Sequence, residues 1–308
     1  MYDLIIIGGG PAAASGGIYA GRKRLKTLVI ADSFGGQSVV SADIQNWVGT
    51  PSISGFELAQ SMEKHLRLQV GVDINEGELV SQVEKKEDGT FIVKTKTKTF
   101  ETKAILVASG SKRKKLNVPG EKELEGKGVF YCSICDAPLF GNKTVAVIGG
   151  GNSALEAVLD LVQYASSIYL IHHGTELKGD AITQEKIKKS DKIHIVYNAE
   201  TTAINGEGSV SGISYTDKTT GEKKTLAVDG VFVEIGAMPS SDFIEGVVQK
   251  NQYGAIIVDP RTQATSTKGI WAAGDVTDLP YRQNNISVGD AVKAVLNIYE
   301  TFHSEGKL

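Results

Sequence analysis

Two stretches decide the fold: Leu4-Ile5-Ile6-Ile7-Gly8-Gly9-Gly10-Pro11-Ala12-Ala13 and Val145-Ala146-Val147-Ile148-Gly149-Gly150-Gly151-Asn152-Ser153-Ala154. Each begins with four apolar residues, a pattern typical of a buried strand in a parallel sheet. Each then passes through three glycines into a segment with helical character, which extends through Ala20 in the first stretch and through Leu161 in the second. The same strand, glycine turn and helix are therefore predicted twice in one chain.

A second apolar strand follows each predicted helix, at Thr27 to Ile30 and at Ile168 to Ile171. This spacing completes a βαβ unit of the length found in dinucleotide-binding domains. Both glycine turns have the form G-x-G-x-x-A. The first glycine permits the tight turn, the second lets a pyrophosphate approach the backbone, and the small third residue lets the helix lie close to the strand. A purely structural turn explains one such motif easily and both of them poorly.

The predicted fold class is therefore α/β, with two Rossmann-like dinucleotide-binding domains, the second inserted into the first. We expect residues 1–116 and 245–308 to form the first domain and residues 117–244 to form the second. Polar segments lie near both crossings, as linkers usually do: Lys112 to Lys115, which we interpret as a solvated loop, and Pro239-Ser240-Ser241.

Other local patterns predict the elements around these two units. They are a half-exposed strand at Thr90 to Thr95, a hairpin formed by residues 212–215 and 224–228, a buried strand at Ile270 to Ala273, and an amphipathic helix from Ala291 to Phe302.

Composition limits the classes of function. The 308 residues are 41% hydrophobic and carry a net charge of -3 without a long basic run, so we expect no nucleic-acid partner. Nowhere do about 18 apolar residues follow one another, so we expect no membrane-spanning helix. Met1-Tyr2-Asp3 lacks the positive charge that opens a signal peptide, and we expect a cytoplasmic protein.

The chain has two cysteines, and they are three residues apart, at Cys132 and Cys135. Thiols at this spacing can close a small disulfide and exchange reversibly with other thiols. A structural zinc site would need two further ligands, and the five histidines are not spaced to supply them, so we expect no metal. Two inert buried cysteines would seldom fall at this spacing. The next residue, Asp136, is interpreted with equal weight as a proton donor and acceptor for the thiolates or as a turn or cap residue.

With these motifs in place, the chain resembles the low-molecular-weight thioredoxin reductases over nearly its full length. The matching segments are Gly8-Gly9-Gly10-Pro11-Ala12, Gly35-Gly36-Gln37, Asn46-Trp47, Val118-Pro119-Gly120, Cys132 to Asp136, Gly149 to Glu156, Gly274-Asp275-Val276, and Arg282-Gln283.

The resemblance implies roles for these residues. The first glycine motif and Gly274-Asp275 would hold FAD, and the other residues of the predicted set would lie close to the cofactor. The full set predicted for FAD is Gly8, Gly10, Pro11, Ala12, Ala13, Gly36, Gln37, Asn46, Gly274, Asp275, Arg282 and Gln283. A reduced nicotinamide nucleotide would bind the second motif through Gly149, Gly151, Asn152, Ser153 and Ala154, with His173 and Lys178 near its ribose. Cys135 would face the flavin, Cys132 would exchange with the protein substrate, and Asp136 would be the acid–base residue. Members of the family are usually homodimers and rotate their inserted domain during turnover.

The sequence departs from the family at the site of the electron donor. Members that use NADPH carry His-Arg-Arg-x-x-x-Arg after the second strand of the inserted domain, where the arginines bind the 2'-phosphate. Here the stretch is His172-His173-Gly174-Thr175-Glu176-Leu177-Lys178. A neutral His and a Gly cannot supply the charged, bidentate group that phosphate recognition favours. Glu176 comes too late to be the acidic residue that binds the 2'-OH of NADH. NADH or low-affinity NADPH ranks ahead of reduced ferredoxin or a flavodoxin.

Two smaller departures are Ser109, where Thr is usual, and Glu234, where an apolar residue is usual. For Glu234 a surface change and an altered docking contact are both open at this point.

Three functional hypotheses follow. The first is a thioredoxin reductase that passes two electrons to a small dithiol protein such as thioredoxin, whose potential is about -270 mV. The second is a dithiol oxidase on the same fold, which would need no nicotinamide. The third is a non-catalytic flavoprotein whose disulfide acts as a redox sensor. The intact Gly149 to Ala154 motif and the position of Asp136 favour the first.

Overall fold

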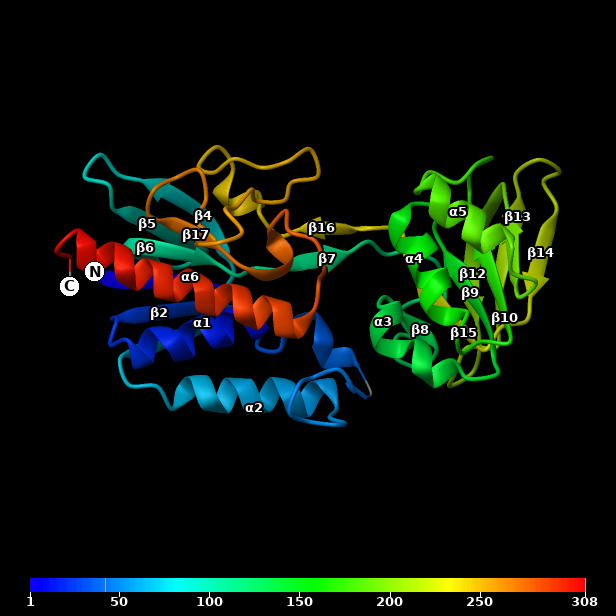
Figure 1. Cartoon of the computed structure of the whole chain (residues 1–308), viewed down its shortest axis with the longest axis horizontal. Coiled ribbons are helices and arrows are strands. Elements are labelled where there is room, and N and C mark those ends of the chain that lie inside the picture. The colour runs from blue at the N-terminus through cyan, green and yellow to red at the C-terminus, as the bar shows by residue number, and fades with distance from the viewer. Residues whose placement is uncertain (42, 308) are drawn as a thin grey trace. The chain divides into compact units, whose positions relative to one another are not determined.

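The computed structural model describes residues 1–41 and 43–307. The chain divides into two compact units, one formed by Met1–Lys112 with Met238–Leu308 and the other by Arg113–Ala237 (Figure 1). The segments that connect them contain the short strands β7 (Ser111–Arg113) and β16 (Ala237–Pro239), which pair with each other.

The first unit is built on a sheet in the order β3-β2-β1-β6-β5-β4, with β17 also paired to β6. Strands β1, β2, β3, β6 and β17 are parallel, whereas β4 and β5 extend the sheet in antiparallel fashion. The strands are β1 (Tyr2–Ile7), β2 (Thr27–Ala31), β3 (Val72–Glu76), β4 (Val80–Lys85), β5 (Phe91–Thr95), β6 (Thr99–Val107) and β17 (Ile270–Ala272); the helices are α1 (Pro11–Arg22), α2 (Gly55–Arg67) and α6 (Asn284–Ser304).

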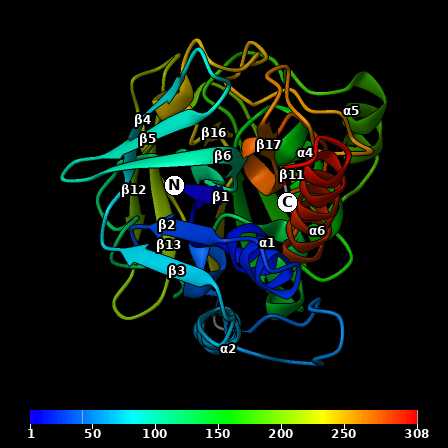
Figure 2. The same ribbon diagram turned by 90° about the vertical axis from the view of Figure 1, so that its left-hand side faces the viewer.

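Strand β1 shows why the apolar run at the N-terminus is continuous. Leu4 and Ile6 pack with α1 and α6 on one face of the sheet, while Ile5 and Ile7 pack into a second core on the other face. Both faces are therefore buried, as expected of a central parallel strand. Figure 2 shows α1 and α6 side by side against the sheet, with α2 outside α1.

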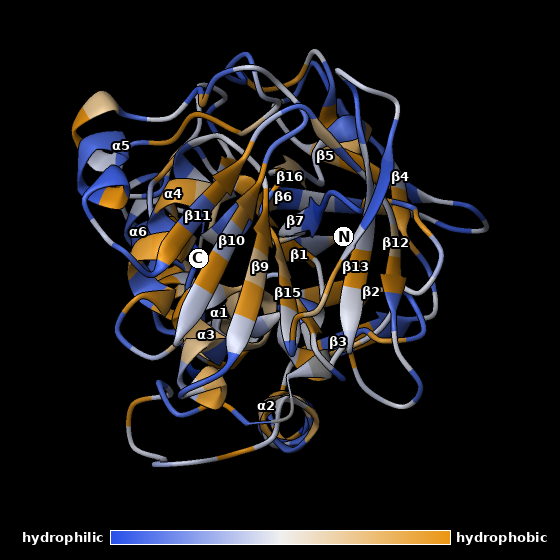
Figure 3. Ribbon diagram, turned by 90° about the vertical axis from the view of Figure 1, so that its right-hand side faces the viewer, coloured by the Kyte–Doolittle hydropathy of each residue, from blue (hydrophilic) through white to orange (hydrophobic). Residues whose placement is uncertain are grey.

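The second unit has a parallel sheet in the order β11-β10-β9-β15-β8 and a separate antiparallel sheet, β12-β13-β14. Its strands are β8 (Val129–Phe130), β9 (Thr144–Ile148), β10 (Ser167–Ile171), β11 (Ile193–Val196), β12 (Ala199–Asn205), β13 (Gly212–Asp217), β14 (Lys223–Leu226) and β15 (Gly230–Val233); its helices are α3 (Ser133–Asp136), α4 (Asn152–Leu161) and α5 (Ala181–Lys188). The apolar colour along β9, β10 and β15 marks its centre (Figure 3).

Three phenylalanines pack together in the second unit. Ring centroids lie 5.6 Å apart for Phe130 and Phe140 and 5.2 Å apart for Phe140 and Phe232. These two pairs meet edge to face, the arrangement that the charge distribution of aromatic rings favours. Phe130 and Phe140 lie on either side of the Cys-x-x-Cys segment in the sequence, so this cluster anchors both ends of that segment.

The predicted α/β class with parallel dinucleotide-binding sheets is confirmed, and the predicted hairpin appears as β13 and β14. Two local expectations were wrong. Helix α6 begins at Asn284, seven residues before the predicted start at Ala291, because polar side chains in its first turns bind distant loops. The segment from Lys112 to Lys115 is not simply a solvated loop, since Arg113 ends β7 and pairs with the buried Glu234.

Candidate active site

Cys132 and Cys135 are joined by a disulfide bond. Cys132 lies at the start of α3 and Cys135 within it, and their Cα atoms are 5.4 Å apart. Both residues are half-buried. The two sulfur atoms thus belong to one short turn between β8 and the 3-10 helix at Ala137–Phe140.

Asp136 directly follows the disulfide and is 4% exposed. Among the described residues no group forms a hydrogen bond with its Oδ1 atom, and its side chain makes no capping bond. Burial raises the pKa of this carboxyl group to about 7. A carboxyl group that titrates near neutral pH can both donate and accept a proton, as general acid–base chemistry requires.

Glu234 is also buried, with 6% of its surface exposed, so the interpretation of this residue as a surface change was wrong. The Nη1 atom of Arg113 lies 3.7 Å from its Oε2 atom. Burial raises the pKa of the Glu234 carboxyl group to about 7, and the nearby Arg113 acts in the opposite direction.

Two polar residues near the disulfide, Ser133 and Asp160, are not indicated by any pattern in the sequence. The hydroxyl of Ser133 donates a 2.7 Å hydrogen bond to Oδ2 of Asp160, which lies near the end of α4. Ser133 stands between the two cysteines, but no local pattern connects it with a carboxylate 27 residues away. Only the packing of α3 on α4 brings the pair together.

The first glycine motif forms an open cradle at the start of α1. A Cβ atom on Gly8 would lie 2.1 Å from the carbonyl oxygen of Ala108, and its φ of +134° also requires glycine. At Gly10 the nearest atom to an added Cβ would be the Cα of Gly36, at 3.8 Å. No side chain caps the helix, which starts with Pro11. This open space before uncapped helix amides fits a pyrophosphate.

Several other residues predicted for FAD come from distant parts of the chain and contact this cradle or one another. A Cβ on Gly274 would lie 3.4 Å from that of Ala12. The Nε2 atom of Gln37 is 3.3 Å from Oδ2 of Asp275. The Nδ2 atom of Asn46 donates a 3.2 Å hydrogen bond to Oε1 of Gln283. These contacts connect the 3-10 helix at Gly36–Val40, the loop after it, and the segments around α6.

Two members of the predicted FAD set differ in their surroundings. Ala13 is fully buried and allows α1 to lie on the sheet. Arg282 is exposed, and within residues 1–41 and 43–307 its guanidinium makes no hydrogen bond or ion pair.

The second glycine motif forms a similar cradle at the start of α4. A Cβ on Gly149 would lie 2.4 Å from the carbonyl oxygen of Glu234 and 2.7 Å from the Cβ of Ala154, which explains the small residue at that position. No atom lies within 4 Å of an added Cβ on Gly151. Ser153 is exposed, and Oδ1 of Asn152 accepts a 2.7 Å hydrogen bond from the amide of Asp180. The geometry fits a second pyrophosphate.

The segment after β10 contains one buried histidine and several exposed residues. His172 is 2% exposed and lies against the glycine turn, since a Cβ on Gly150 would be 2.2 Å from its Nδ1 atom. Burial lowers the pKa of His172 and so favours the neutral form of its imidazole. His173, Glu176 and Lys178 are exposed. The predicted ribose contacts, His173 and Lys178, are therefore accessible.

Neither a metal cluster nor a membrane span is found in the part of the chain that the structure describes. Among these residues no three His, Cys, Asp or Glu side chains are grouped as metal ligands. No described helix is long and apolar enough to cross a bilayer.

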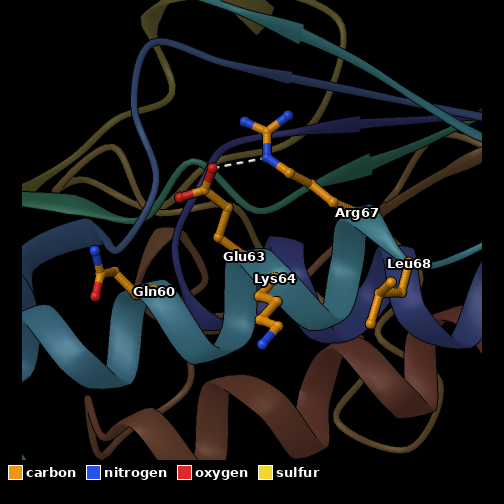
Figure 4. Close-up of a pocket in the computed structure, with 5 residues that line it drawn as sticks. All are labelled: Gln60, Glu63, Lys64, Arg67 and Leu68. Atoms are coloured by element: carbon orange, nitrogen blue, oxygen red, sulfur yellow. Dashed lines mark hydrogen bonds and ion pairs between the residues drawn. The ribbon is translucent and has the colours of Figure 1, made fainter.

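A separate surface hollow lies on α2 (Figure 4) and contains none of the residues predicted for a cofactor. Its lining is Gln60, Glu63, Lys64, Arg67 and Leu68. The ion pair between Arg67 Nε and Glu63 Oε1, 2.7 Å, is solvent-exposed and is worth only about 0.3–0.5 kcal/mol.

Comparison with known proteins places this geometry in a family. Residues 2–295 match the family model described as "Pyridine nucleotide-disulphide oxidoreductase". Thioredoxin reductase from Streptococcus pyogenes is 33% identical and superimposes with a TM-score of 0.92, with 99% of each chain covered. Thioredoxin reductase from T. acidophilum is 36% identical over 97% of this chain and 98% of that one, with a TM-score of 0.66.

The chain belongs to the pyridine nucleotide-disulphide oxidoreductases and, within them, to the low-molecular-weight thioredoxin reductase family. The solved structures that it resembles are thioredoxin reductases, and the family to which it belongs uses FAD and NADH or NADPH.

Curated relatives are longer. "NADH dehydrogenase" of Bacillus subtilis is 39% identical, with 97% of this chain and 58% of the relative covered. Alkyl hydroperoxide reductase F of Staphylococcus aureus is 40% identical, with 97% and 59% covered. The chain thus spans less than two thirds of the length of these relatives.

Proposed function

We propose that the chain transfers two electrons from NADH, through FAD and the Cys132–Cys135 disulfide, to the disulfide of a small thioredoxin-like protein. The observation that carries this proposal is the closed disulfide followed by the buried carboxyl group of Asp136, whose Oδ1 atom has no hydrogen-bond partner among the described residues. The second nucleotide cradle lies in the same unit as the disulfide, and the FAD cradle lies in the other unit.

Different residues of the chain would bind the cofactor, accept the electrons and transfer the protons. Gly10, Gly36, Gln37 and Asp275 would hold FAD, which when bound carries two electrons between a hydride donor and a disulfide. The chain's disulfide takes up two electrons, its S–S bond breaks, and two protons complete two thiols. Asp136 directly follows Cys135 and has a pKa raised to about 7, and both properties support a role in delivering or removing one of these protons.

Exchange with the partner balances in the same way. The Cys132 thiolate attacks the partner's disulfide and forms a mixed disulfide, releasing one partner thiolate. Cys135 then attacks Cys132, the S–S bond between Cys132 and Cys135 forms again, and the second partner thiol leaves. Protonation of the departing thiolates falls to Asp136 and water. The division of roles between the cysteines follows the family resemblance.

NADH is the preferred donor in this proposal. His173 and Gly174 offer no fixed charge for a 2'-phosphate, and Lys178 is exposed. The relative named "NADH dehydrogenase" supports the same choice. Weak use of NADPH ranks next, followed by reduced ferredoxin or a flavodoxin.

The acceptor has a second candidate. Relatives at 40% identity are named as alkyl hydroperoxide reductase F, which favours a dithiol protein that serves peroxide reduction as an alternative to thioredoxin itself. The dithiol oxidase and the redox sensor rank below both. A cytoplasmic homodimer completes the proposal on the basis of the family.

The test is an anaerobic titration of the FAD-loaded protein with NADH, NADPH, dithiothreitol and reduced ferredoxin, each added separately, while the flavin absorbance is monitored. Rapid bleaching by NADH, with slow bleaching by NADPH, supports the proposal. Bleaching by the dithiol alone would assign an oxidase, and bleaching by reduced ferredoxin alone would assign a protein-fed reductase. Turnover with thioredoxin and with a peroxidase dithiol protein then identifies the acceptor.

A further inference from the structure

Glu234 occupies a position that joins several parts of the second unit. It directly follows β15, and its amide donates a 2.8 Å hydrogen bond to the carbonyl of Ile148. Its own carbonyl oxygen lies against Gly149, as the 2.4 Å approach of an added Cβ shows. The side chain is also enclosed, since only 6% of the surface of Glu234 is exposed.

The carboxylate of Glu234 is directed at charged and polar groups near the disulfide. The guanidinium of Arg113 and the backbone amide of Ser133 both stabilise its charged form. A buried carboxylate is costly unless such partners compensate for its lost hydration. Ser133 is bound a second time, because its hydroxyl donates to Asp160. The residue between the two cysteines is thus held from two sides by carboxylates.

We propose that Glu234 is a positioning residue of the redox pair: with Asp160 it fixes Ser133, and its negative charge disfavours thiolate formation at the reduced cysteines. The proposal rests on the redox role of Cys132 and Cys135 proposed above. It assigns a function to the residue that replaces the apolar side chain usual in the family.

Among the described residues, the groups with the main effects on the charge of Glu234 are in the second unit. Burial raises the pKa of Glu234 to about 7, Asp160 and Glu156 on α4 act in the same direction, and Arg113 on β7 and the Ser133 amide on α3 oppose them. Glu234 is therefore mostly neutral at about pH 6 and mostly charged at about pH 8.5.

The protonation state of Glu234 determines how this residue affects the reduction of the disulfide. When Glu234 is charged, it destabilises a nearby thiolate and with it the reduced state, so the disulfide becomes harder to reduce. When Glu234 is neutral, this contribution vanishes. The effect of the charge on the disulfide potential should therefore depend on pH, whereas a purely structural effect should not.

The experiment compares the wild type with Glu234→Gln, which keeps the size of the side chain and removes its charge. The thiol–disulfide equilibrium of Cys132 and Cys135 is measured in glutathione or dithiothreitol buffers by trapping free thiols with a mass label. At about pH 8.5 we expect an equilibrium constant for reduction roughly tenfold higher in the variant, equal to about 30 mV for this two-electron couple. At about pH 6 the two proteins should agree.

Three further proteins make the result decisive. Glu207→Gln removes an exposed carboxylate of the same unit and should leave the equilibrium unchanged at both pH values. Ser133→Ala breaks the bond to Asp160 without changing the charge of Glu234, so any shift it causes should be equal at both. Glu234→Met provides a second neutral variant, should Glu234→Gln be poorly folded by circular dichroism.

Equal shifts at both pH values, or no shift in either neutral variant, would overturn the proposal. Because the trapping assay needs no nicotinamide and no partner protein, it remains readable even when turnover with thioredoxin is absent. Failure of the proposed function and failure of this inference are therefore distinguishable.

Discussion

The Nε2 atom of Gln37 lies 3.3 Å from Oδ2 of Asp275, although the two residues are 238 positions apart. This contact connects the segment after β2 with the 3-10 helix after β17, and the neighbouring residues Gly36 and Gly274 both approach the glycine cradle of the first unit. The residues that would hold FAD are thus brought together by the sheet, and their separate contributions can be tested.

Gly10 and Gly8 should respond differently to substitution. Gly10→Val places a side chain in open space where a pyrophosphate would approach, so the protein should fold while its FAD content drops at least about tenfold. Gly8→Ala drives a Cβ into the Ala108 carbonyl at a positive φ and should lower the free energy of unfolding by more than about 2 kcal/mol. Flavin absorbance and thermal unfolding of the apoproteins measure the two effects. Equal flavin content in Gly10→Val and the wild type would contradict the assignment.

Cys135→Ser should abolish reduction of thioredoxin-like disulfides while leaving FAD bound. The cysteines lie in the second unit, whereas the predicted FAD residues lie in the first, so loss of one thiol should not disturb the cofactor. Steady-state turnover with a disulfide substrate and the flavin spectrum are the measurements. Turnover retained above a few per cent would reverse the proposed roles of the cysteines.

Asp136→Asn should stabilise the protein at alkaline pH. Since the pKa of Asp136 is raised from 3.8 to about 7, the folded state holds its proton longer than the unfolded state, and stability falls as pH rises from about 4 to about 7. The neutral variant avoids this loss, so above pH 7 its free energy of unfolding should be higher by up to about 4 kcal/mol. At about pH 4 the two should coincide. Denaturant titrations at both pH values provide the check.

The same variant should also lose activity. We expect Asp136→Asn to lower the rate of disulfide reduction by about 10²–10⁴-fold, the range typical of general acid–base groups. Pre-steady-state mixing with NADH separates this defect from flavin reduction, which should remain fast. A variant that turns over at the wild-type rate would leave Asp136 with a structural role only.

Donor preference should shift when charge is restored beside the second cradle. His173→Arg combined with Lys178→Arg places guanidinium groups at two exposed positions and should lower KM for NADPH by at least about tenfold, with KM for NADH nearly unchanged. Gly174 is unsuitable for such a change, because a Cβ there would lie 2.7 Å from Nε2 of the buried His172. Gly174→Arg should therefore lower thermal stability. The ratio of kcat/KM for the two nucleotides, measured in each variant, decides the point.

Sequence pattern was sufficient for the fold because both glycine motifs are local and follow strands buried on two faces. It failed where a residue's environment depends on distant segments. Asn284 and Asn285 begin α6 because they contact Ser38 and the amide of Val48, more than 230 residues earlier. The buried state of Glu234 and the bond from Ser133 to Asp160 depend in the same way on how α3 and α4 pack. The cysteines and glycines were recognisable because their chemistry is fixed by short spacing alone.

The packing of Phe130 and Phe140, which lie on either side of the turn that holds Cys132 and Cys135, has a consequence for the proposed catalytic cycle. Breaking the sulfur–sulfur bond releases a covalent link, but the aromatic contacts still fix the entry and exit of the turn. The two thiols consequently remain at a high effective concentration with respect to each other. Ring closure, and with it the release of a reduced partner, requires no search through unfolded conformations.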